Sequence, residues 1–357
     1  MKILLVAKLA DNSLNSILRP LLLQKDLEHV YVLRDTPGTI VNEKVTYISG
    51  TSDGTSKSLK QINKVRIGIQ ICKKYNIDII AGVLIYPHGY IGRLISLLSG
   101  LPYIHVTVAG HREYWVKGWL IEKINLLLFR GSRVVTVTGK KTYDYLISNG
   151  FNPDRIVILP NVISMERYND FNKERKYDIV SISRIDKNKN ISLLLKALHK
   201  LNKSVETNAI IAGDGPDFEN IKEEARALGI EQHIQFTGWI GEESKNDIYN
   251  NAKVYVLCSK GEGFPLALLE AMACGCVPVV SDVGDITDAV KDGYNGYVYK
   301  NFNNEDELAA ILGSLIKVPE KIKKLSSKAK EIKKEYSLER VNEIWGSVLE
   351  IASNQVN

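Results

Sequence analysis

Short apolar runs alternate with longer, helix-like runs along most of this chain of 357 residues. The apolar runs predict buried strands, because they are rich in Val, Ile and Tyr and too short for core helices. They lie at residues 2–6, 29–33, 45–48, 77–84, 103–108, 133–138 and 155–159, and then at 177–183, 209–213, 234–238, 253–258 and 277–281. Two consecutive strand–helix series predict an α/β protein with two Rossmann-like, doubly wound parallel sheets.

A polar and charged stretch, residues 161–176, interrupts this alternation and has no clear periodicity. We therefore predict a first domain over 1–165 and a second over 166–336, followed by a last helix at about Ser337 to Ser353 within residues 337–357. The length of 357 residues, with 45% hydrophobic and 25% charged residues, suits a soluble protein of two domains.

Targeting and cysteine patterns point to the cytoplasm. No run of about eighteen apolar residues occurs, and the start Met1 to Lys8 reads as a first strand rather than as a signal peptide. No histidine ligand pattern accompanies the four cysteines, which we expect to be reduced and buried: Cys72, Cys258, Cys274 and Cys276.

Two carboxylates, Glu262 and Glu270, flank the start of an apolar helix between two predicted strands. Pro265 suits a first helical position, and Gly275 with Pro278 forms a stop signal. The unit is strand, loop, helix, strand. Because parallel strands bind ligands beyond their carboxyl ends, the amides at the helix start favour an anion there, and a phosphate would fit.

Glu270 lies among apolar neighbours, where an unpaired carboxylate is costly. Its partner could be a pair of sugar or ribose hydroxyls, which one carboxylate accepts together. It could also be a backbone amide or a buried Lys or Arg, and taken alone the second interpretation is favoured, since structural ion pairs are common.

The segment Ser259-Lys-Gly-Glu262-Gly-Phe-Pro265 to Glu270-Ala-Met-Ala-Cys-Gly-Cys-Val-Pro-Val-Val280 resembles the signature of the retaining, nucleotide-sugar-dependent glycosyltransferases of family 4. Further matches follow the family's order from about residue 158 to 300. They are Ser183-Arg184-Ile-Asp-Lys-Asn-Lys189, Ile211-Ala-Gly-Asp-Gly-Pro216, Phe236-Thr-Gly238 and Asp292-Gly-Tyr-Asn-Gly296. The resemblance implies the GT-B fold, in which two Rossmann-like domains face across a cleft and the last helix crosses back to the first domain.

The resemblance also implies roles on the donor side. Arg184 and Lys189 would clamp the diphosphate, Glu270 would bind the ribose hydroxyls, and Glu262 would face the transferred sugar. The backbone of Ile240 would meet the base, and the backbone that holds sugar hydroxyls and the distal phosphate would be Gly263, Phe264, Pro265, Leu266 and Ala267. Alone, Arg184 and Lys189 would read as solvated loop residues. No Asp-x-Asp pair is present to hold a metal against a diphosphate, so we expect no metal and no other cofactor.

The first domain departs from the family pattern. The loop from Lys8 to Ser16 contains no glycine, where many relatives have a pair near the diphosphate. His111 stands close to the place of a family histidine. It could contact the transferred sugar, and we count it among the candidate catalytic residues with Glu262, Arg184 and Lys189, but an ordinary loop histidine fits equally well. Gly213-Asp-Gly-Pro216 reads as a structural turn beside the cleft, since the longer phosphate-binding glycine spacing is absent.

Positive charge is concentrated in the first half. Lys and Arg minus Asp and Glu give 21 − 11 = +10 over residues 1–160 and 26 − 30 = −4 over 161–357. Two segments, 57–74 and 114–133, mix basic with apolar or aromatic residues. They suit an anionic membrane surface and a lipid-linked acceptor, or else are ordinary helices over a core. No motif for nucleic acid accompanies the charge.

These patterns and the resemblance predict a glycosyltransferase that uses a UDP-sugar first or a GDP-sugar next. Its acceptor would be a lipid-linked or saccharide precursor of a cell-surface polysaccharide or glycolipid, at the inner face of the cell membrane. Two alternatives stay open: a GT-B-type sugar-nucleotide epimerase, and a non-catalytic protein that binds nucleotide-sugars. Retention of the anomeric configuration follows from the resemblance alone.

Overall fold

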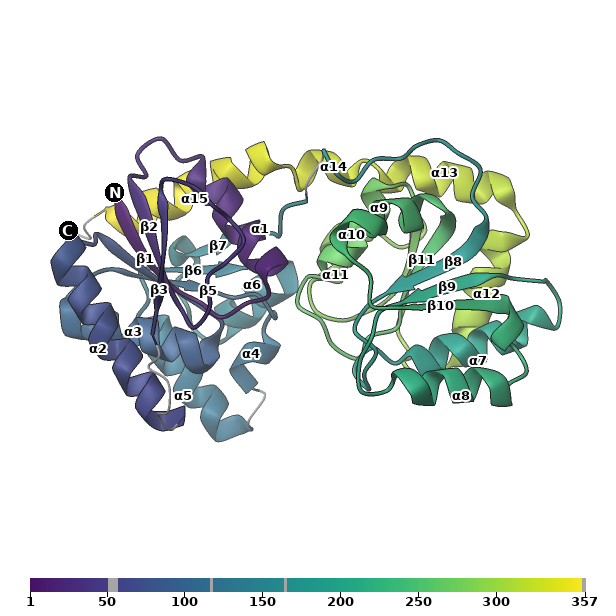
Figure 1. The fold of residues 1–357 in the computed structure, drawn as a ribbon, viewed down its shortest axis with the longest axis horizontal. Helices are drawn as coiled ribbons and strands as arrows, with labels where there is room; N and C mark the ends of the chain where they lie inside the picture. The colour runs from purple at the N-terminus through teal and green to yellow at the C-terminus, as the bar shows by residue number, and fades with distance from the viewer. Residues whose placement is uncertain (51–56, 116–117, 164–165, 355–357) are drawn as a thin grey trace. The chain divides into compact units, whose positions relative to one another are not determined.

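The chain is described here in a computed structural model that covers residues 1–50, 57–115, 118–163 and 166–354. It divides into two compact units, the first made of residues 1–162 and 338–357 and the second of residues 163–337. Each unit is a parallel sheet with helices on both faces (Figure 1). The predicted fold class, two doubly wound α/β domains, is confirmed.

The first unit contains a seven-stranded sheet in the order β3-β2-β1-β4-β5-β6-β7, in which every paired strand is parallel to its neighbour. The strands are β1 (Lys2–Val6), β2 (His29–Arg34), β3 (Val45–Ser49), β4 (Ile79–Val83), β5 (Tyr103–Val106), β6 (Val134–Val137) and β7 (Ile156–Ile158). The helices are α1 (Asp11–Leu22), α2 (Lys57–Tyr75), η1 (Ile85–Gly89), α3 (Tyr90–Ser99), α4 (Arg112–Trp115), α5 (Trp119–Arg130), α6 (Lys140–Ser148), η2 (Pro153–Arg155) and α15 (Leu338–Ser353).

Alternate residues of β1 face two separate apolar cores, as the period of two in a strand requires. Ile3 and Leu5 join the core under α1 and α15, in which Trp345 of α15 is 1% exposed. Leu4 and Val6 join the core under α2, α3, α5 and α6. The last helix of the chain therefore packs on the first unit.

The second unit contains a six-stranded parallel sheet in the order β10-β9-β8-β11-β12-β13. The strands are β8 (Tyr177–Ile182), β9 (Ala209–Ala212), β10 (Ile234–Gly238), β11 (Ala252–Leu257), β12 (Val277–Ser281) and β13 (Tyr297–Tyr299), of which β13 was not predicted. The helices are α7 (Ile191–Asn202), α8 (Phe218–Ala227), η3 (Glu231–His233), α9 (Glu242–Asn250), α10 (Leu266–Ala273), α11 (Ile286–Ala289), α12 (Glu305–Ile316), α13 (Pro319–Ala329) and α14 (Ile332–Glu335).

Helices cover this second sheet on both faces. α9, α10 and α14 pack with Tyr255 and Leu257 of β11 on one face. α7, α8 and α12 pack with Val254 and Val256 on the other. Among the described helices, none combines the length and the apolar composition needed to cross a membrane.

Candidate active site

The loops that carry the predicted donor residues gather at one edge of the second sheet. Because its strands are parallel, the loops after β8, β9, β10, β11 and β12 all leave from their carboxyl ends. β8 and β11 are direct neighbours, and so are β11 and β12. This places the Arg184 to Lys189 loop beside the Glu262 loop.

The two predicted cations of the first of these loops differ in their surroundings. Arg184 is exposed over 71% of its side chain, and its Nε lies 3.6 Å from Asp186 Oδ2. The ammonium of Lys189 is more enclosed and lies 2.5 Å from Glu262 Oε1. The carboxylate of Asp186 accepts the backbone N–H groups of Asn188 and Lys189 at 3.0 and 3.1 Å. The side chain of Asp186 thus fixes the shape of this loop. The side chain of Arg184 remains accessible to a ligand.

The loop that contains Glu262 is held from both sides. Asn188 donates its side-chain amide to the Gly261 carbonyl at 2.8 Å, and its own carbonyl accepts the Lys260 N–H at 2.8 Å. On the other side, Asp285 N–H donates to the Gly263 carbonyl at 3.0 Å. Gly284 has a φ of +53°, and a Cβ there would lie 2.2 Å from the Glu262 carbonyl oxygen. The backbone at Glu262 is therefore fixed before any ligand binds.

Helix α10 follows directly. Pro265 was predicted at the first helical position, but the helix begins at Leu266 and Pro265 is the preceding cap residue, with a ψ of 125°. Phe264 is buried and stacks on Tyr336 with ring centres 5.3 Å apart, which anchors the helix start. The first-turn amides of Leu266 and Ala267 have no acceptor within the helix, as at every helix start. Gly275, with a φ of +79°, ends the helix as predicted.

Glu270 is 5% exposed and is paired within the protein. Its Oε2 accepts a hydrogen bond from the Tyr249 hydroxyl at 3.2 Å and lies 3.6 Å from the ammonium of Lys245. Burial raises the pKa of the Glu270 carboxyl, while the charge of Lys245 acts in the opposite direction. A buried lysine, one of the two kinds of partner considered for this carboxylate, is therefore present.

The sequence interpretation missed the groups around Glu270. Lys245 also pairs with Glu242, whose Oε2 accepts the hydroxyl of Tyr168 at 3.1 Å. Lys245 is only 16% exposed, although it lies in a charged run that reads as a solvated helix face. One feature of the sequence did indicate such a group: an unpaired buried carboxylate at Glu270 would be costly. A cation on an element adjacent to α10 could therefore be expected.

The glycines after β9 support the site without contributing side chains. Gly213 has a φ of +130°, and a Cβ there would lie 1.8 Å from the Ser183 carbonyl oxygen. A Cβ on Gly215 would lie 2.2 Å from the Ile185 carbonyl oxygen. The turn therefore packs directly under the Arg184 loop. Ile240, the predicted base contact, follows β10 and is partly buried against the α10 core.

His111 belongs to the first unit, between β5 and α4. The backbone N–H of His111 donates to Thr142 Oγ1 at 3.1 Å. The centre of its ring lies 5.3 Å from that of Tyr145 and 6.5 Å from that of Trp115. The imidazole is held between aromatic rings near the carboxyl end of β5. This environment suits either interpretation of His111.

The loop after β1 is shorter than the segment from Lys8 to Ser16 suggested, because α1 begins at Asp11. The side chain of Arg34 fixes it, with Nη1 3.0 Å from Asp11 Oδ1 and Nη2 3.3 Å from the Leu9 carbonyl.

The two basic segments of the first unit contain both buried and exposed side chains. Lys64 belongs to the segment 57–74, and it is 2% exposed and lies 2.8 Å from Asp35 Oδ1, because α2 packs beside the carboxyl end of β2. Lys117 lies outside the described residues, as do the side chains at positions 57–59. In the other segment, Phe129 is buried and Trp119 is 68% exposed.

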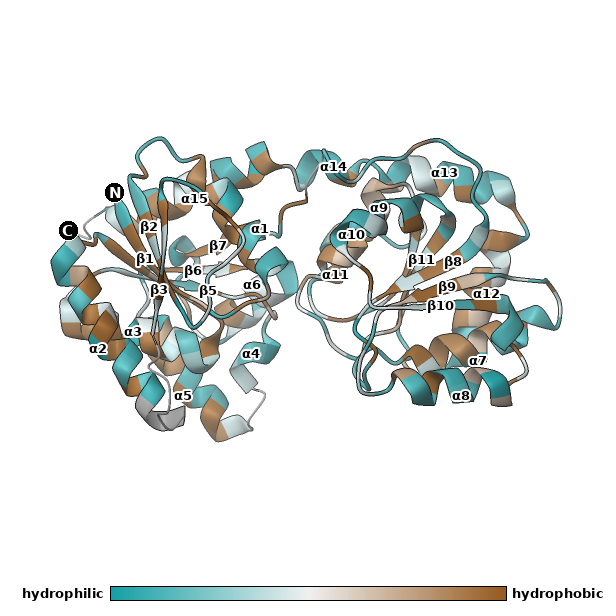
Figure 2. Cartoon of the chain, viewed as in Figure 1, coloured by the Kyte–Doolittle hydropathy of each residue, from teal (hydrophilic) through white to brown (hydrophobic). Residues whose placement is uncertain are grey.

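Several apolar residues of α2, α3 and α5 are nevertheless exposed, among them Ile62 of α2. Figure 2 draws the hydrophobic residues of these helices as brown ribbon segments. α3 and α5 are joined by a hydrogen bond from Tyr90 to Asn125. We name the exposed members the α3–α5 patch: Leu94, Leu97, Leu98, Trp119, Leu120, Ile124 and Leu127, between 46% and 73% exposed. Lys123 stands over the Trp119 ring at 4.9 Å.

The cysteines Cys72, Cys258, Cys274 and Cys276 are free and buried. Within the described ranges, no group of three or more His, Cys, Asp or Glu side chains has a geometry that could hold a metal ion.

Comparison with known proteins gives one family match. Residues 165–332 match the family described as glycosyl transferases group 1. The matched segment covers nearly all of the second unit, including every donor-side residue named above.

The curated relatives include two that match more than half of this chain. An uncharacterized glycosyltransferase of Haemophilus influenzae is 28% identical over 62% of this chain and 66% of its own length, just under two thirds. The alpha-monoglucosyldiacylglycerol synthase of Streptococcus pneumoniae is 25% identical over 78% of this chain and 68% of its own.

A solved structure shares the fold. The Anabaena protein HepE, in complex with UDP and glucose, superposes with a TM-score of 0.80 at 18% identity, covering 98% of this chain and 99% of that one. At this identity the likeness concerns the fold.

Proposed function

We propose that this chain is a glycosyltransferase that transfers a sugar from a nucleoside diphosphate donor with retention of configuration, a proposal supported by the match of residues 165–332 to the group 1 family. The observation that carries the proposal is the pairing of Lys189 with Glu262 between the loops after β8 and β11, with Arg184 exposed in the first loop and Glu270 in the helix that follows the second. These groups match the parts of such a donor: two cations for the diphosphate and two carboxylates for hydroxyls.

The two cations, Arg184 and Lys189, would stabilise the nucleoside diphosphate as it leaves. As the bond between the sugar and the diphosphate breaks, negative charge grows on the departing oxygen, and fixed positive charge lowers the barrier. Arg184 can bind a phosphate through two N–H groups at once, and Lys189 acts as a point charge. Because these residues supply the charge, we propose that the transfer needs no metal ion and no other cofactor.

The carboxylates address the sugars. Glu262, held between Asn188 and Asp285, would accept hydroxyls of the transferred sugar, with the backbone from Gly263 to Ala267 at the helix start. Glu270 would accept the two ribose hydroxyls while Lys245 and Tyr249 keep it oriented. The backbone at Ile240 would contact the base. UDP is the first choice of nucleotide and GDP the second; the UDP and glucose in HepE support this order by likeness of fold.

Retention of the anomeric configuration depends on which face of the sugar the acceptor attacks. Neither carboxylate is a nucleophile in this reading, so the acceptor would attack the face from which the diphosphate leaves. An inverted anomeric configuration in the product would refute this mechanism, and NMR of the product measures it directly.

For the acceptor we propose a lipid-linked or saccharide precursor of a surface polysaccharide or glycolipid, met at the cytoplasmic face of a membrane. The α3–α5 patch supports this, because apolar and aromatic side chains with basic neighbours suit an anionic bilayer. The name of the Streptococcus relative, alpha-monoglucosyldiacylglycerol synthase, supports a lipid acceptor.

A donor screen tests the function. The protein is incubated with UDP-, GDP- and ADP-sugars, with and without membranes, and free nucleoside diphosphate is measured. Release that depends on membranes or acceptor, with the sugar found in a new glycoside, supports transfer. An isomerised sugar still bound to the nucleotide would instead identify an epimerase, and no release with any donor would favour a non-catalytic binder.

A further inference from the structure

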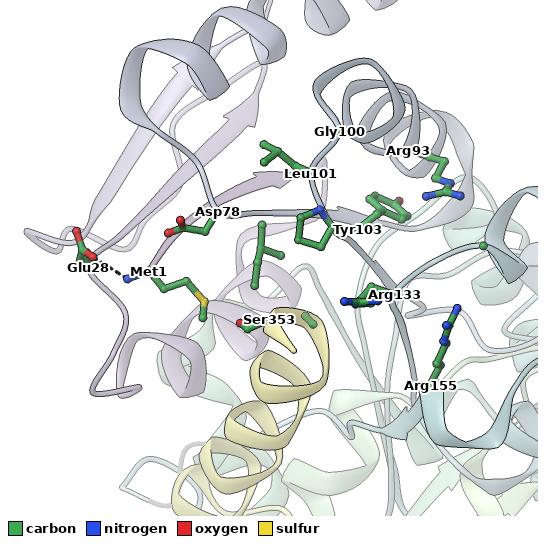
Figure 3. Close-up of a pocket in the computed structure, with 14 residues that line it drawn as sticks. Met1, Glu28, Asp78, Arg93, Gly100, Leu101, Tyr103, Arg133, Arg155 and Ser353 are labelled. Atoms are coloured by element: carbon green, nitrogen blue, oxygen red, sulfur yellow. Dashed lines mark hydrogen bonds and ion pairs between the residues drawn. The ribbon is translucent and has the colours of Figure 1, made fainter. Parts of the chain in front are cut away.

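A pocket lies in the first unit at the amino ends of the strands, on the side of the sheet opposite to the loop that contains His111. Its lining comes from the amino ends of neighbouring strands: Met1 before β1, Asp78 before β4, Arg133 before β6 and Arg155 before β7. The pocket has a volume of about 880 Å³. Figure 3 shows three arginines, Arg93, Arg133 and Arg155, on one side of it and Met1, Glu28 and Asp78 on the other.

The three guanidinium groups carry positive charge that the described part of the chain does not neutralise. In the described ranges, no carboxylate pairs with Arg93, Arg133 or Arg155. Arg93 lies over the Tyr103 ring at 5.7 Å, and Arg133 donates to the Asn354 carbonyl. The Nε atoms of Arg93 and Arg133 are buried without a hydrogen-bond acceptor. Because a guanidinium has five N–H donors, a single acceptor such as the Asn354 carbonyl leaves Arg133 with donor capacity for a ligand.

The carboxylates on the other side of the pocket are already occupied. Glu28 lies 2.8 Å from the amino group of Met1, and Asp78 accepts the Lys2 N–H at 2.7 Å. Three guanidinium groups and one amino group against two carboxylates give 4 − 2, or a net charge of +2 in the lining. Like charges in one cavity repel each other, and a bound anion offsets that repulsion.

Contacts with neighbouring backbone and side chains hold Arg93 at the pocket. The guanidinium of Arg93 lies against the backbone at Gly131. A Cβ at Gly131 would lie 2.6 Å from Arg93 Nη2, so only glycine leaves room for this contact. Tyr103, which forms the floor beneath Arg93, is 1% exposed and donates its hydroxyl to the Gly89 carbonyl at 3.0 Å. The guanidinium of Arg93 is therefore held between the backbone at Gly131 and the buried ring of Tyr103.

We propose that this pocket, with Arg93, Arg133 and Arg155, binds an anion that bears a phosphate group. Arginine is the side chain that matches phosphate oxygens in pairs, and all three arginines line this pocket. The site belongs to the first unit alone and does not depend on the proposed function of the second. The phosphate could belong to a small soluble molecule or to a lipid headgroup, which have the same chemistry here.

Calorimetric titration with inorganic pyrophosphate tests the site in an Arg184→Gln/Lys189→Gln background, which removes the proposed donor clamp. We expect one site to remain there. Adding Arg133→Gln and Arg155→Gln should weaken it at least about tenfold, the effect of losing one good charged hydrogen bond. The matched control Arg19→Gln removes an exposed arginine of α1 outside the pocket and should leave binding unchanged.

A second experiment measures binding of the same variants to vesicles of phosphatidic acid in phosphatidylcholine. It distinguishes a soluble phosphate compound from a lipid headgroup. Binding of pyrophosphate that depends on Arg133 and Arg155 indicates a soluble ligand, and binding of vesicles alone with the same dependence indicates a headgroup. Binding of neither, or equal binding by the arginine variants, overturns the proposal.

A fold control separates a ligand site from a structural cluster. Without ligand, the Arg133→Gln/Arg155→Gln variant should melt no lower than the unsubstituted protein, because two mutually repelling charges are removed. A lower melting temperature together with unchanged pyrophosphate binding would mean that the arginines only hold the fold.

Discussion

The ammonium of Lys189 lies 2.5 Å from Oε1 of Glu262, although 73 positions separate the two residues in the chain. The pair joins the loops after β8 and β11, and only the parallel pairing of these two strands brings them together. In the proposed reaction Lys189 turns to the diphosphate and Glu262 to the sugar, so the pair holds both groups in place until the donor binds.

Replacing Lys189 with Met should lower kcat/KM by about 10²–10³-fold, the usual effect of removing one group that stabilises charge in the transition state. The methylene chain is kept, so the loss measures the ammonium. Initial rates of nucleoside diphosphate release over a range of donor concentrations provide the values.

Lys187→Met is the matched control, because Lys187 is an exposed lysine in the same loop. It should change kcat/KM by less than about threefold, as for an exposed charge screened by solvent. Equal losses in both variants would show that the loop needs only positive charge, and would contradict the specific role of Lys189.

Glu270→Gln tests the ribose contact. If Glu270 binds both ribose hydroxyls, the unsubstituted protein should bind UDP about 10–100-fold more tightly than 2′-deoxy-UDP, because a hydrogen bond to a charged group is lost. The Gln variant should bind the two nucleotides nearly equally. Glu262→Gln should keep the preference for UDP. Preservation of the preference in Glu270→Gln would reduce Glu270 to a structural partner of Lys245.

The central part of the fold could be predicted because apolar strands are local features. β1, β10 and β12 have the predicted bounds, and most other strands end within one or two residues of them. β13 was missed because its three residues follow a turn and form no run of their own.

The partners in the site were harder to predict, because they depend on contacts between distant segments. Lys245 reads as a solvated residue until α9 packs beside α10 and brings it to Glu270. Lys64 reads as part of a basic face until Asp35 of another element covers it. The sequence indicates that a buried charge needs a partner, but the choice of partner is made by the tertiary structure.

Leu127→Ser tests membrane binding by the α3–α5 patch. Leu127 is 73% exposed, and transfer of a leucine from water into an apolar layer is worth about 1.5–3 kcal/mol when complete. Sedimentation with anionic vesicles should therefore show binding weakened by about tenfold. Leu23→Ser is the control: Leu23 is 51% exposed and follows α1, which covers the opposite face of the sheet. Equal binding by both variants, or binding independent of anionic lipid, would rule out the patch.

The stability of the first unit should fall in mild acid. Burial, together with the charge of Lys64, lowers the pKa of His88 from 6.5 to about 4, with Asp35 opposing and Lys8 adding to the effect. Between these values the unfolded chain takes up a proton that the folded chain does not, so unfolding becomes easier as the pH falls from 6.5 to 4 and is unaffected by this group above 6.5.

Urea unfolding at pH 8 and at pH 4.5 measures the effect. His88→Gln should remove up to about 3 kcal/mol of the difference between the two pH values. Part of the difference should remain, because burial also lowers the pKa of His105, to about 3. The value at pH 8 serves as the internal reference, since both imidazoles are neutral there. An unchanged pH dependence in His88→Gln would mean that His88 is protonated in the folded protein.

Gly213→Ala should disturb the donor site from beneath. Its φ of +130° is unfavourable for alanine, and the new Cβ would meet the Ser183 carbonyl oxygen at 1.8 Å, so the backbone next to Arg184 must move. Gly229→Ala separates the two effects, because Gly229 also has a positive φ, +68°, but no atom lies within 4 Å of its Cβ position. We expect Gly229→Ala to cost about 1 kcal/mol of unfolding free energy with normal donor affinity. Gly213→Ala should cost about 2 kcal/mol more and weaken UDP binding. If the two variants lose equal stability and both bind UDP normally, the turn after β9 does not support the Arg184 loop.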